Sequence, residues 1–130
     1  MLVADFECQA ADIDEAPLSN EQPSDYVCRM SAEKAAKVWI PGTVVLGADT
    51  TVVCKGRVMQ KPDSFADAEG MLRSLSGLTH DVMTSVTLMS DVRVTTELVH
   101  TRVEFAELSS GLIAQYLATD EPWDKAGAYG

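Results

Sequence analysis

The apolar run Val44-Val45-Leu46 leads through Gly47-Ala48 to Asp49 and Thr50, and it constrains the fold more than any other stretch. Because its apolar residues do not alternate with polar ones, the run predicts a strand buried on both faces. Such a strand delivers the carboxylate of Asp49 at the point where the run stops. Active-site acids occur at strand ends, but an acid there is more often a turn former or a helix cap. Taken alone, the stretch favours a structural role for Asp49.

Composition limits the partners of the chain. With 130 residues, 46% of them hydrophobic, the chain can bury the core of a single domain spanning 1–130. Acidic residues outnumber basic ones by 20 to 10, and the net charge of -10 argues against binding a nucleic-acid polymer or an anionic membrane. A small anionic ligand would need a local cluster of basic residues and the help of a divalent cation.

The cysteines indicate a reducing compartment. Cys8, Cys28 and Cys54 are odd in number and lack the spacing of zinc ligands or of a CxxC motif. They predict reduced thiols in a cytoplasmic protein. No apolar run is long enough to span a bilayer.

A helix is predicted from Ser24, as its N-cap, to about Trp39. Its apolar residues at helical spacing, expected to face the core, are Val27, Met30, Ala35 and Val38. Lys34 lies at the edge of this stripe, where a lysine either extends into solvent, the default, or reaches into a cleft. Before the helix, the acidic cluster 12–15 is either a solvated loop or a loop that binds metal or nucleotide.

A hairpin is predicted after Asp49. The segment 50–54 is β-branched and apolar, Lys55-Gly56 is typical of a turn, and 57–60 can return as the partner strand. Asp49 and Lys61 flank this hairpin, so an acid and a base can meet at one point. A surface hairpin with scattered charges would have a similar sequence.

The next helix is predicted from a capping signal at Ser64 and Asp67 to Gly77. Its expected buried stripe is Phe65, Ala68, Met71, Leu72 and Leu75. His80 is expected to be structural, at the junction between this helix and the next strand.

Alternation from Asp81 predicts a strand, a turn at 90–91, and one long strand or two over 92–105. Ser109 can cap a last helix, and the residues expected to face inward are Leu112, Ile113, Tyr116 and Leu117. The tail 120–130 is rich in small residues, so its backbone can approach a ligand, with Lys125 as a phosphate contact. A flexible terminus would have the same composition.

A set of motifs resembles the Maf family of nucleoside triphosphate pyrophosphatases. They are Ala-Glu-Lys-Ala (32–35), Leu-Gly-Ala-Asp-Thr (46–50), Gln-Lys-Pro (60–62), Leu-Ser-Gly-Leu-Thr-His (75–80) and Asp-Lys-Ala-Gly-Ala-Tyr-Gly (124–130). Within the family, the second and the last resemble the branch that acts on dTTP and UTP. The resemblance implies hydrolysis between the α- and β-phosphates with a divalent metal, usually Mg²⁺ and otherwise Mn²⁺. It also implies an α/β fold, a mixed twisted sheet with flanking helices and two lobes around a cleft, shared with the inosine triphosphate pyrophosphatases.

The resemblance also implies roles for particular residues. Asp49 would be the catalytic carboxylate and touch the metal, and Glu15 would assist with metal or water. Lys34 and Lys61 would hold phosphate and take part in catalysis, and Thr50 would help to select the base. These roles agree with the chemistry, because lysines neutralise charge that develops on phosphates.

Segments typical of the family are missing from the sequence. Family members begin with a strand and a Ser-x-Ser-Pro-Arg-Arg loop that grips the triphosphate, and they continue after Ala-Tyr-Gly with Ile-Gln-Gly, further strands and a helix. A domain incomplete at both termini implies weakened or lost activity, and self-association that covers exposed sheet edges. The alternative function is a non-catalytic nucleotide-binding or protein-interaction module, linked to the control of cell division.

Overall fold

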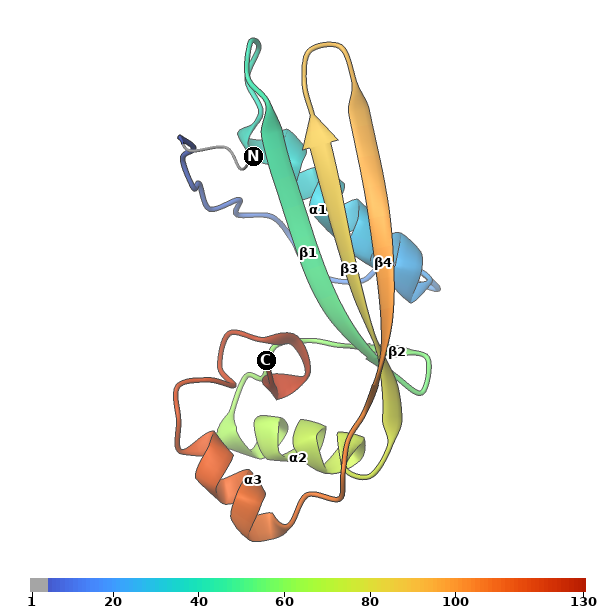
Figure 1. Ribbon diagram of the computed structural model, residues 1–130, viewed down its shortest axis with the longest axis vertical. Helices are drawn as coiled ribbons and strands as arrows, with labels where there is room; N and C mark the ends of the chain where they lie inside the picture. Colours follow the sequence, from blue (N-terminus) through green and yellow to red (C-terminus); the bar gives the residue numbers. More distant parts are fainter. Residues whose placement is uncertain (1–4) are drawn as a thin grey trace.

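The computed structural model describes residues 5–130, which form a long upper lobe and a compact lower lobe (Figure 1). The elements in chain order are α1 (Pro23–Val38), β1 (Val45–Cys54), β2 (Arg57–Met59), α2 (Phe65–Leu75), β3 (Thr79–Met89), β4 (Val94–Glu104), α3 (Ser110–Leu117) and the 3₁₀ turn η1 (Ala126–Ala128). The α/β fold class predicted from the sequence is confirmed.

The sheet has the strand order β2-β1-β3-β4, and neighbouring strands are antiparallel. β1 pairs with β3 from Val45 to Val53, whereas β2 pairs only with the last three residues of β1. In the described part of the chain, the outer edge of β1 before Val52 therefore has no strand beside it. Asp49 lies on this open edge.

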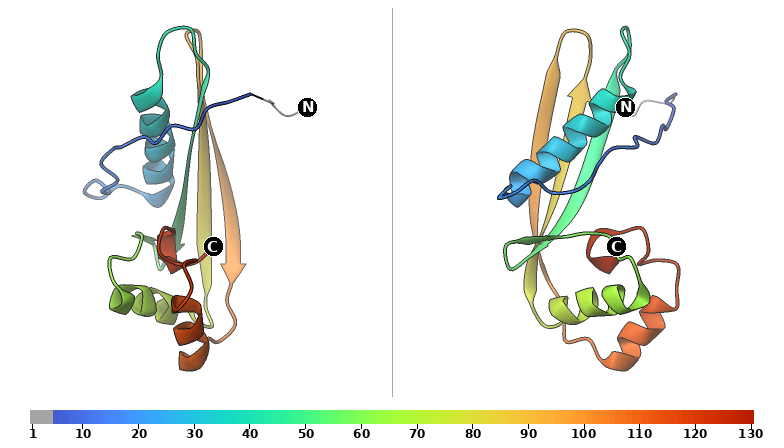
Figure 2. Two further views of the ribbon diagram at one scale, coloured as in Figure 1. Left: turned by 90° about the vertical axis from the view of Figure 1, so that its left-hand side faces the viewer. Right: turned by 180° about the vertical axis from the view of Figure 1, so that it is seen from behind.

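Helix α1 packs against one face of the upper sheet (Figure 2). The close approach depends on Gly47 in β1, because a Cβ there would meet the backbone oxygen of Ser31 at 2.4 Å. The hydroxyl of Ser31 lies 2.8 Å from the hydroxyls of both Ser85 and Thr87 in β3. Since side chains alternate along a strand, Asp49, two residues after Gly47, shares the face that α1 covers.

The lower lobe packs α2, α3 and η1 together below the sheet (Figure 1). Its fully buried cluster comprises Ala68, Leu72, Ile113, Leu117 and Ala128. Side-chain caps begin both helices as predicted, since the hydroxyls of Ser64 and Ser109 accept hydrogen bonds from the backbone N–H groups of Asp67 and Leu112. The tail of the chain, with η1, belongs to this lobe and contacts the lower end of β1, where Gly127 lies against the side chain of Val52.

The prediction that the central strand is buried on both faces is wrong for its first half. Val44, just before β1, is 70% exposed, and Leu46 is 67% exposed. The reason is that α1 covers only one face of the sheet. The same limit applies to Phe65 and Leu112, predicted to face inward but about half exposed, because the lower lobe has too few layers to cover them.

Smaller differences concern the ends of elements. Helix α1 starts with Pro23 as its first residue and Gln22 as its N-cap, so Ser24 lies inside the first turn. Proline is favoured there because the first N–H groups of a helix have no partner within it. β3 begins at Thr79, two residues before the predicted start, and it includes His80. Gly77 adopts the positive φ of 65° that ends α2, as predicted.

The described residues contain free thiols at Cys8, Cys28 and Cys54, as predicted. Among residues 5–130, no helix combines the length and the apolar character that crossing a membrane requires.

Candidate active site

Asp49 projects from β1 toward helix α1, and its side chain is 13% exposed. The Nζ of Lys34 donates a hydrogen bond of 2.6 Å to its Oδ1. Burial raises the pKa of Asp49, and the bond from Lys34 only partly opposes this effect. A carboxylate whose pKa is raised toward neutral pH is a better proton acceptor than one at its ordinary pKa.

Lys34 joins two carboxylates that are distant in the sequence. Besides Asp49, its Nζ contacts Oε1 of Glu15 at 2.8 Å. Burial disfavours the charged lysine, but the hydrogen bonds to Asp49 and Glu15 outweigh burial and raise its pKa. Lys34 therefore reaches into the cleft as a cation, and the solvent-facing position expected by default is wrong.

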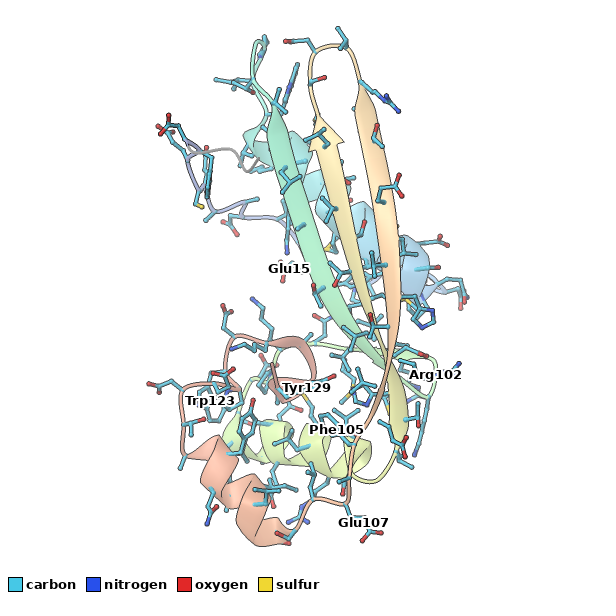
Figure 3. All side chains as sticks on the ribbon, viewed as in Figure 1. Glu15, Arg102, Phe105, Glu107, Trp123 and Tyr129 are labelled. Atoms are coloured by element: carbon cyan, nitrogen blue, oxygen red, sulfur yellow. The ribbon has the colours of Figure 1, made fainter. Side chains whose placement is uncertain are left out.

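Glu15 lies beside β1, just above the lower lobe (Figure 3). Its loop is anchored to α1, because the hydroxyl of Tyr26 donates to the backbone oxygen of Glu15 at 2.8 Å. Arg29 donates to the backbone oxygen of Ala16 at 3.1 Å and binds both carboxylate oxygens of Glu21 at 2.6 and 2.8 Å. Glu15 is thus held as part of the cleft wall, whereas Asp12 and Asp14 of the same acidic segment are exposed to solvent.

The lower lobe contributes further lysines. Lys61 follows β2 and pairs with Asp124 at 2.7 Å, where both side chains are exposed. The bond from Lys61 lowers the pKa of Asp124. Lys125 instead turns toward Glu121, where its Nζ contacts the backbone oxygen at 3.0 Å and the carboxylate at 3.4 Å. Both lysines can be redirected to an anion, because their present partners lie at the surface.

All the site residues predicted from the sequence line one cleft of about 620 Å³ between the two lobes. They are Glu15, Lys34, Asp49, Thr50, Lys61 and Lys125. Direct contacts join Lys34 with Asp49 and Glu15, whereas Lys61 and Lys125 pair with other acids in the described residues. The Thr50 hydroxyl lies 2.8 Å from that of Thr84 across the strand pair. Because side chains alternate along a strand, the Thr50 side chain lies on the sheet face away from the Asp49 side chain, although both residues line the cleft.

Sequence reasoning missed some residues that line the same cleft. Tyr26 was missed because a single aromatic residue in a helix is usually part of the core. Asp124 was missed because only its neighbour Lys125 was considered as a contact for phosphate. Tyr129 also lines the cleft, and its signal was its place in the motif at 124–130.

The family model described as "Maf-like protein" matches residues 1–130. The chain belongs to the Maf family. It is 46% identical over 129 residues to a dTTP/UTP pyrophosphatase of Vibrio parahaemolyticus. The aligned segment covers 97% of this chain and 68% of the relative. It is also 48% identical over 124 residues to a dTTP/UTP pyrophosphatase of Shewanella denitrificans, and this aligned segment covers 92% of this chain and 63% of the relative.

A third relative is the dTTP/UTP pyrophosphatase of Hahella chejuensis, which is 48% identical over 136 residues. This alignment covers 99% of this chain and 67% of the relative. The chain thus spans about two thirds of the length of the curated relatives it matches. Since the Maf match covers the whole chain, it includes every residue of the cleft.

Proposed function

We propose that this Maf-family chain belongs to a nucleoside triphosphate pyrophosphatase that acts on dTTP and UTP. The observation that carries the proposal is the convergence of Glu15 and Asp49 on the ammonium of Lys34 in one cleft, with Lys61 and Lys125 on its opposite wall. Acids beside cations are what a site needs to activate water next to a polyphosphate. Relatives named dTTP/UTP pyrophosphatase support the choice of nucleotide.

In the proposed reaction, water attacks the α-phosphorus. A new bond forms from the water oxygen to phosphorus, the bond to the oxygen that bridges to the β-phosphorus breaks, and pyrophosphate leaves. Asp49 accepts the proton of the water, for which its raised pKa suits it. Lys34 and Lys61 hold the phosphates and neutralise the charge of the leaving group.

A divalent cation, Mg²⁺ or Mn²⁺, fits the residues of the cleft. Glu15 and Asp49 already converge on one cation, the Lys34 ammonium, and they would be the protein ligands. Within residues 5–130, no group of three or more His, Cys, Asp or Glu side chains could hold a metal. Mg²⁺ does not require one, because it is commonly bound by one or two carboxylates together with substrate phosphates and water. When bound, the cation would neutralise phosphate charge.

Pyrophosphate release from dTTP, UTP, CTP and 7-methyl-GTP with Mg²⁺ tests the proposal. We expect dTTP and UTP to be hydrolysed fastest and Asp49→Asn to lower the rate by about 10²–10⁴-fold, the usual contribution of a general base. Asp91→Asn is the matched control, because Asp91 binds the backbone of Gly42 outside the cleft. Chelation by EDTA should abolish the activity.

Equal background rates for wild type and Asp49→Asn would end the enzymatic proposal. Retained nucleotide binding in that case would favour the alternative, a non-catalytic binding module. As part of the same proposal we place the protein in the cytoplasm, where free thiols such as those of Cys8, Cys28 and Cys54 persist.

We also propose that copies of the chain associate through the sheet face that α1 leaves uncovered. Leu46 and Leu88, a register pair, are 67% and 46% exposed there, and Val99 of β4 is 60% exposed. Large apolar side chains exposed on one sheet face are typical of interfaces. Light scattering should show a dimer or larger assembly that Leu46→Thr with Val99→Thr dissociates. A monomer at high concentration with a cooperative melt would contradict self-association.

A further inference from the structure

The segment 124–130 forms part of the cleft wall, and its backbone is fixed against β1 and the residue after β2. The N–H of Gly127 donates to the backbone oxygen of Gln60 at 3.1 Å. Gly127 also packs directly on Val52, since a Cβ at this position would lie 3.1 Å from the Val52 side chain. These contacts fix the path of the backbone, but they do not set the direction of the Tyr129 ring.

The Tyr129 ring is held by residues from other elements. Its hydroxyl lies 2.5 Å from Nε2 of His80 in β3. The ring also packs edge-on against His80 and Phe105, with centroid separations of 5.5 and 4.8 Å. His80 is 2% exposed and itself packs edge-on against Phe105, so it cannot follow the tyrosine if the ring rotates. Figure 3 shows Tyr129 and Phe105 together in the lower lobe, below Glu15.

Tyr129 also separates two hollows. On one side is the cleft that contains Lys34 and Asp49. On the other is an apolar cavity of about 270 Å³, lined among others by Leu72 and Ile113. Because Tyr129 lines both, together with Gly130, it forms part of the boundary between a polar cleft and an apolar cavity.

We propose that His80 is a positioning residue for the nucleotide cleft, because its hydrogen bond holds the ring of Tyr129 as a cleft wall. The inference rests on the proposed function for its kinetic consequence. Lys34 and Asp49 are held by α1 and β1, not by the segment 124–130. Release of the ring should therefore weaken nucleotide binding while leaving the chemical step nearly intact.

The test compares variants that remove the same hydrogen bond from either side. His80→Phe keeps a ring in the buried site, and Tyr129→Phe removes only the hydroxyl. Each should raise KM for dTTP or UTP by about tenfold, the effect of one lost hydrogen bond, with kcat within about threefold of wild type. The double variant should be no worse than either single one, because both lose one shared bond. His80→Gln, whose amide can reach the position of Nε2, should restore KM.

Measurements without turnover separate this inference from the proposed function. Calorimetry with the non-hydrolysable α,β-methylene analogue of dUTP should show the same rise in Kd for His80→Phe and its rescue by His80→Gln. Binding of the analogue by a wild-type chain that releases no pyrophosphate would refute the enzymatic proposal and leave the positioning role intact. Absence of binding by wild type would overturn both.

Additive effects would also overturn the inference, as would a fall in kcat alone or an unchanged KM and Kd in both single variants. If His80→Phe does not fold, Tyr129→Phe decides, because it leaves the buried histidine in place. The imidazole ¹⁵N signals of His80 in the ligand-free chain should shift on Tyr129→Phe. An unchanged spectrum would show that the hydrogen bond is not formed in solution, and it would reject the role.

Discussion

The ammonium nitrogen of Lys34 lies 2.6 Å from Oδ1 of Asp49, which links helix α1 to the open edge of β1. Both side chains are mostly buried, with exposed fractions of 22% and 13%. A charge in such a place is stabilised by its partner and is costly once the partner is removed. The pair therefore serves both the proposed chemistry and the packing of α1 on the sheet.

We predict strong coupling between Lys34 and Asp49 in a double-mutant cycle. Lys34→Met should lower the free energy of unfolding by about 1–3 kcal/mol, because it leaves Asp49 partly buried without its cation. In the Asp49→Asn background, the same substitution should cost clearly less. Urea denaturation of the four proteins measures the coupling. Equal costs of Lys34→Met in both backgrounds would show that the pair contributes nothing to the fold.

The contact between Gly47 and α1 predicts a second effect on stability. In Gly47→Ala the new methyl group would meet Ser31 and Ala35 at 2.4–2.8 Å, and both are parts of a packed helix. The helix must shift, at an expected cost of about 1–3 kcal/mol for overpacking. The matched control is Gly70→Ala inside α2, where nothing lies within 4 Å of the new methyl group. It should stabilise the chain by up to about 1 kcal/mol through helix propensity.

Urea midpoints of both variants check this pair of expectations. A stable Gly47→Ala would mean that α1 and β1 are not in close contact. The same substitution should thus have opposite signs at the two positions, because overpacking dominates at Gly47 and helix propensity acts without a clash at Gly70.

Local signals were sufficient to predict much of the fold. Ser64 and Ser109 marked helix starts because a hydroxyl at the N-cap meets free N–H groups whatever the tertiary context. The turn at Lys55-Gly56 could be predicted from Gly56, because glycine adopts positive φ without a steric cost, and Lys55 beside it also adopts positive φ in the structure. Every site residue predicted through the family motifs lines one cleft, because those motifs lie where chain segments from both lobes meet.

Contacts between elements that are distant in the chain could not be predicted from the sequence. The exposure of Leu46 depends on the absence of a second layer over one sheet face in the described chain, and an apolar run carries no sign of this. The direction of Lys34 depended on Glu15 and Asp49, which approach it from a loop and a strand. The partner of His80 is 49 residues away, so its buried position could be expected but its bond to Tyr129 could not.

Buried and exposed hydroxyl pairs should differ in their contribution to stability. Thr87 is fully buried, and its hydroxyl lies 2.8 Å from those of both Ser31 and Thr96. Thr87→Val should destabilise the chain by about 1–2 kcal/mol, because buried hydroxyls lose a partner without gaining water. Thr50→Val, which breaks the exposed bond to Thr84, should change the free energy of unfolding by less than about 0.5 kcal/mol. Similar thermal midpoints for the two variants would contradict the distinction.

The ion pair between Arg29 and Glu21 predicts a loss of stability in acid. The bond from Arg29 and the backbone N–H of Leu18 lower the pKa of Glu21 from 4.5 to about 2. Between these pH values the unfolded chain binds more protons than the folded one, so the contribution of Glu21 is complete above pH 4.5 and is lost as the pH falls toward 2.

Urea midpoints of wild type and Glu21→Gln, measured from pH 7 to pH 3, check this prediction. Wild type should be more stable at pH 7, and the difference should shrink as the pH falls, because only wild type loses the ionised partner of Arg29. Glu33→Gln is the matched control, since Glu33 makes one longer contact of 3.2 Å with the same arginine and is 45% exposed. It should change the midpoint little at either pH. A difference between wild type and Glu21→Gln that is constant across the range would mean that the carboxylate charge does not anchor the loop that carries Glu15.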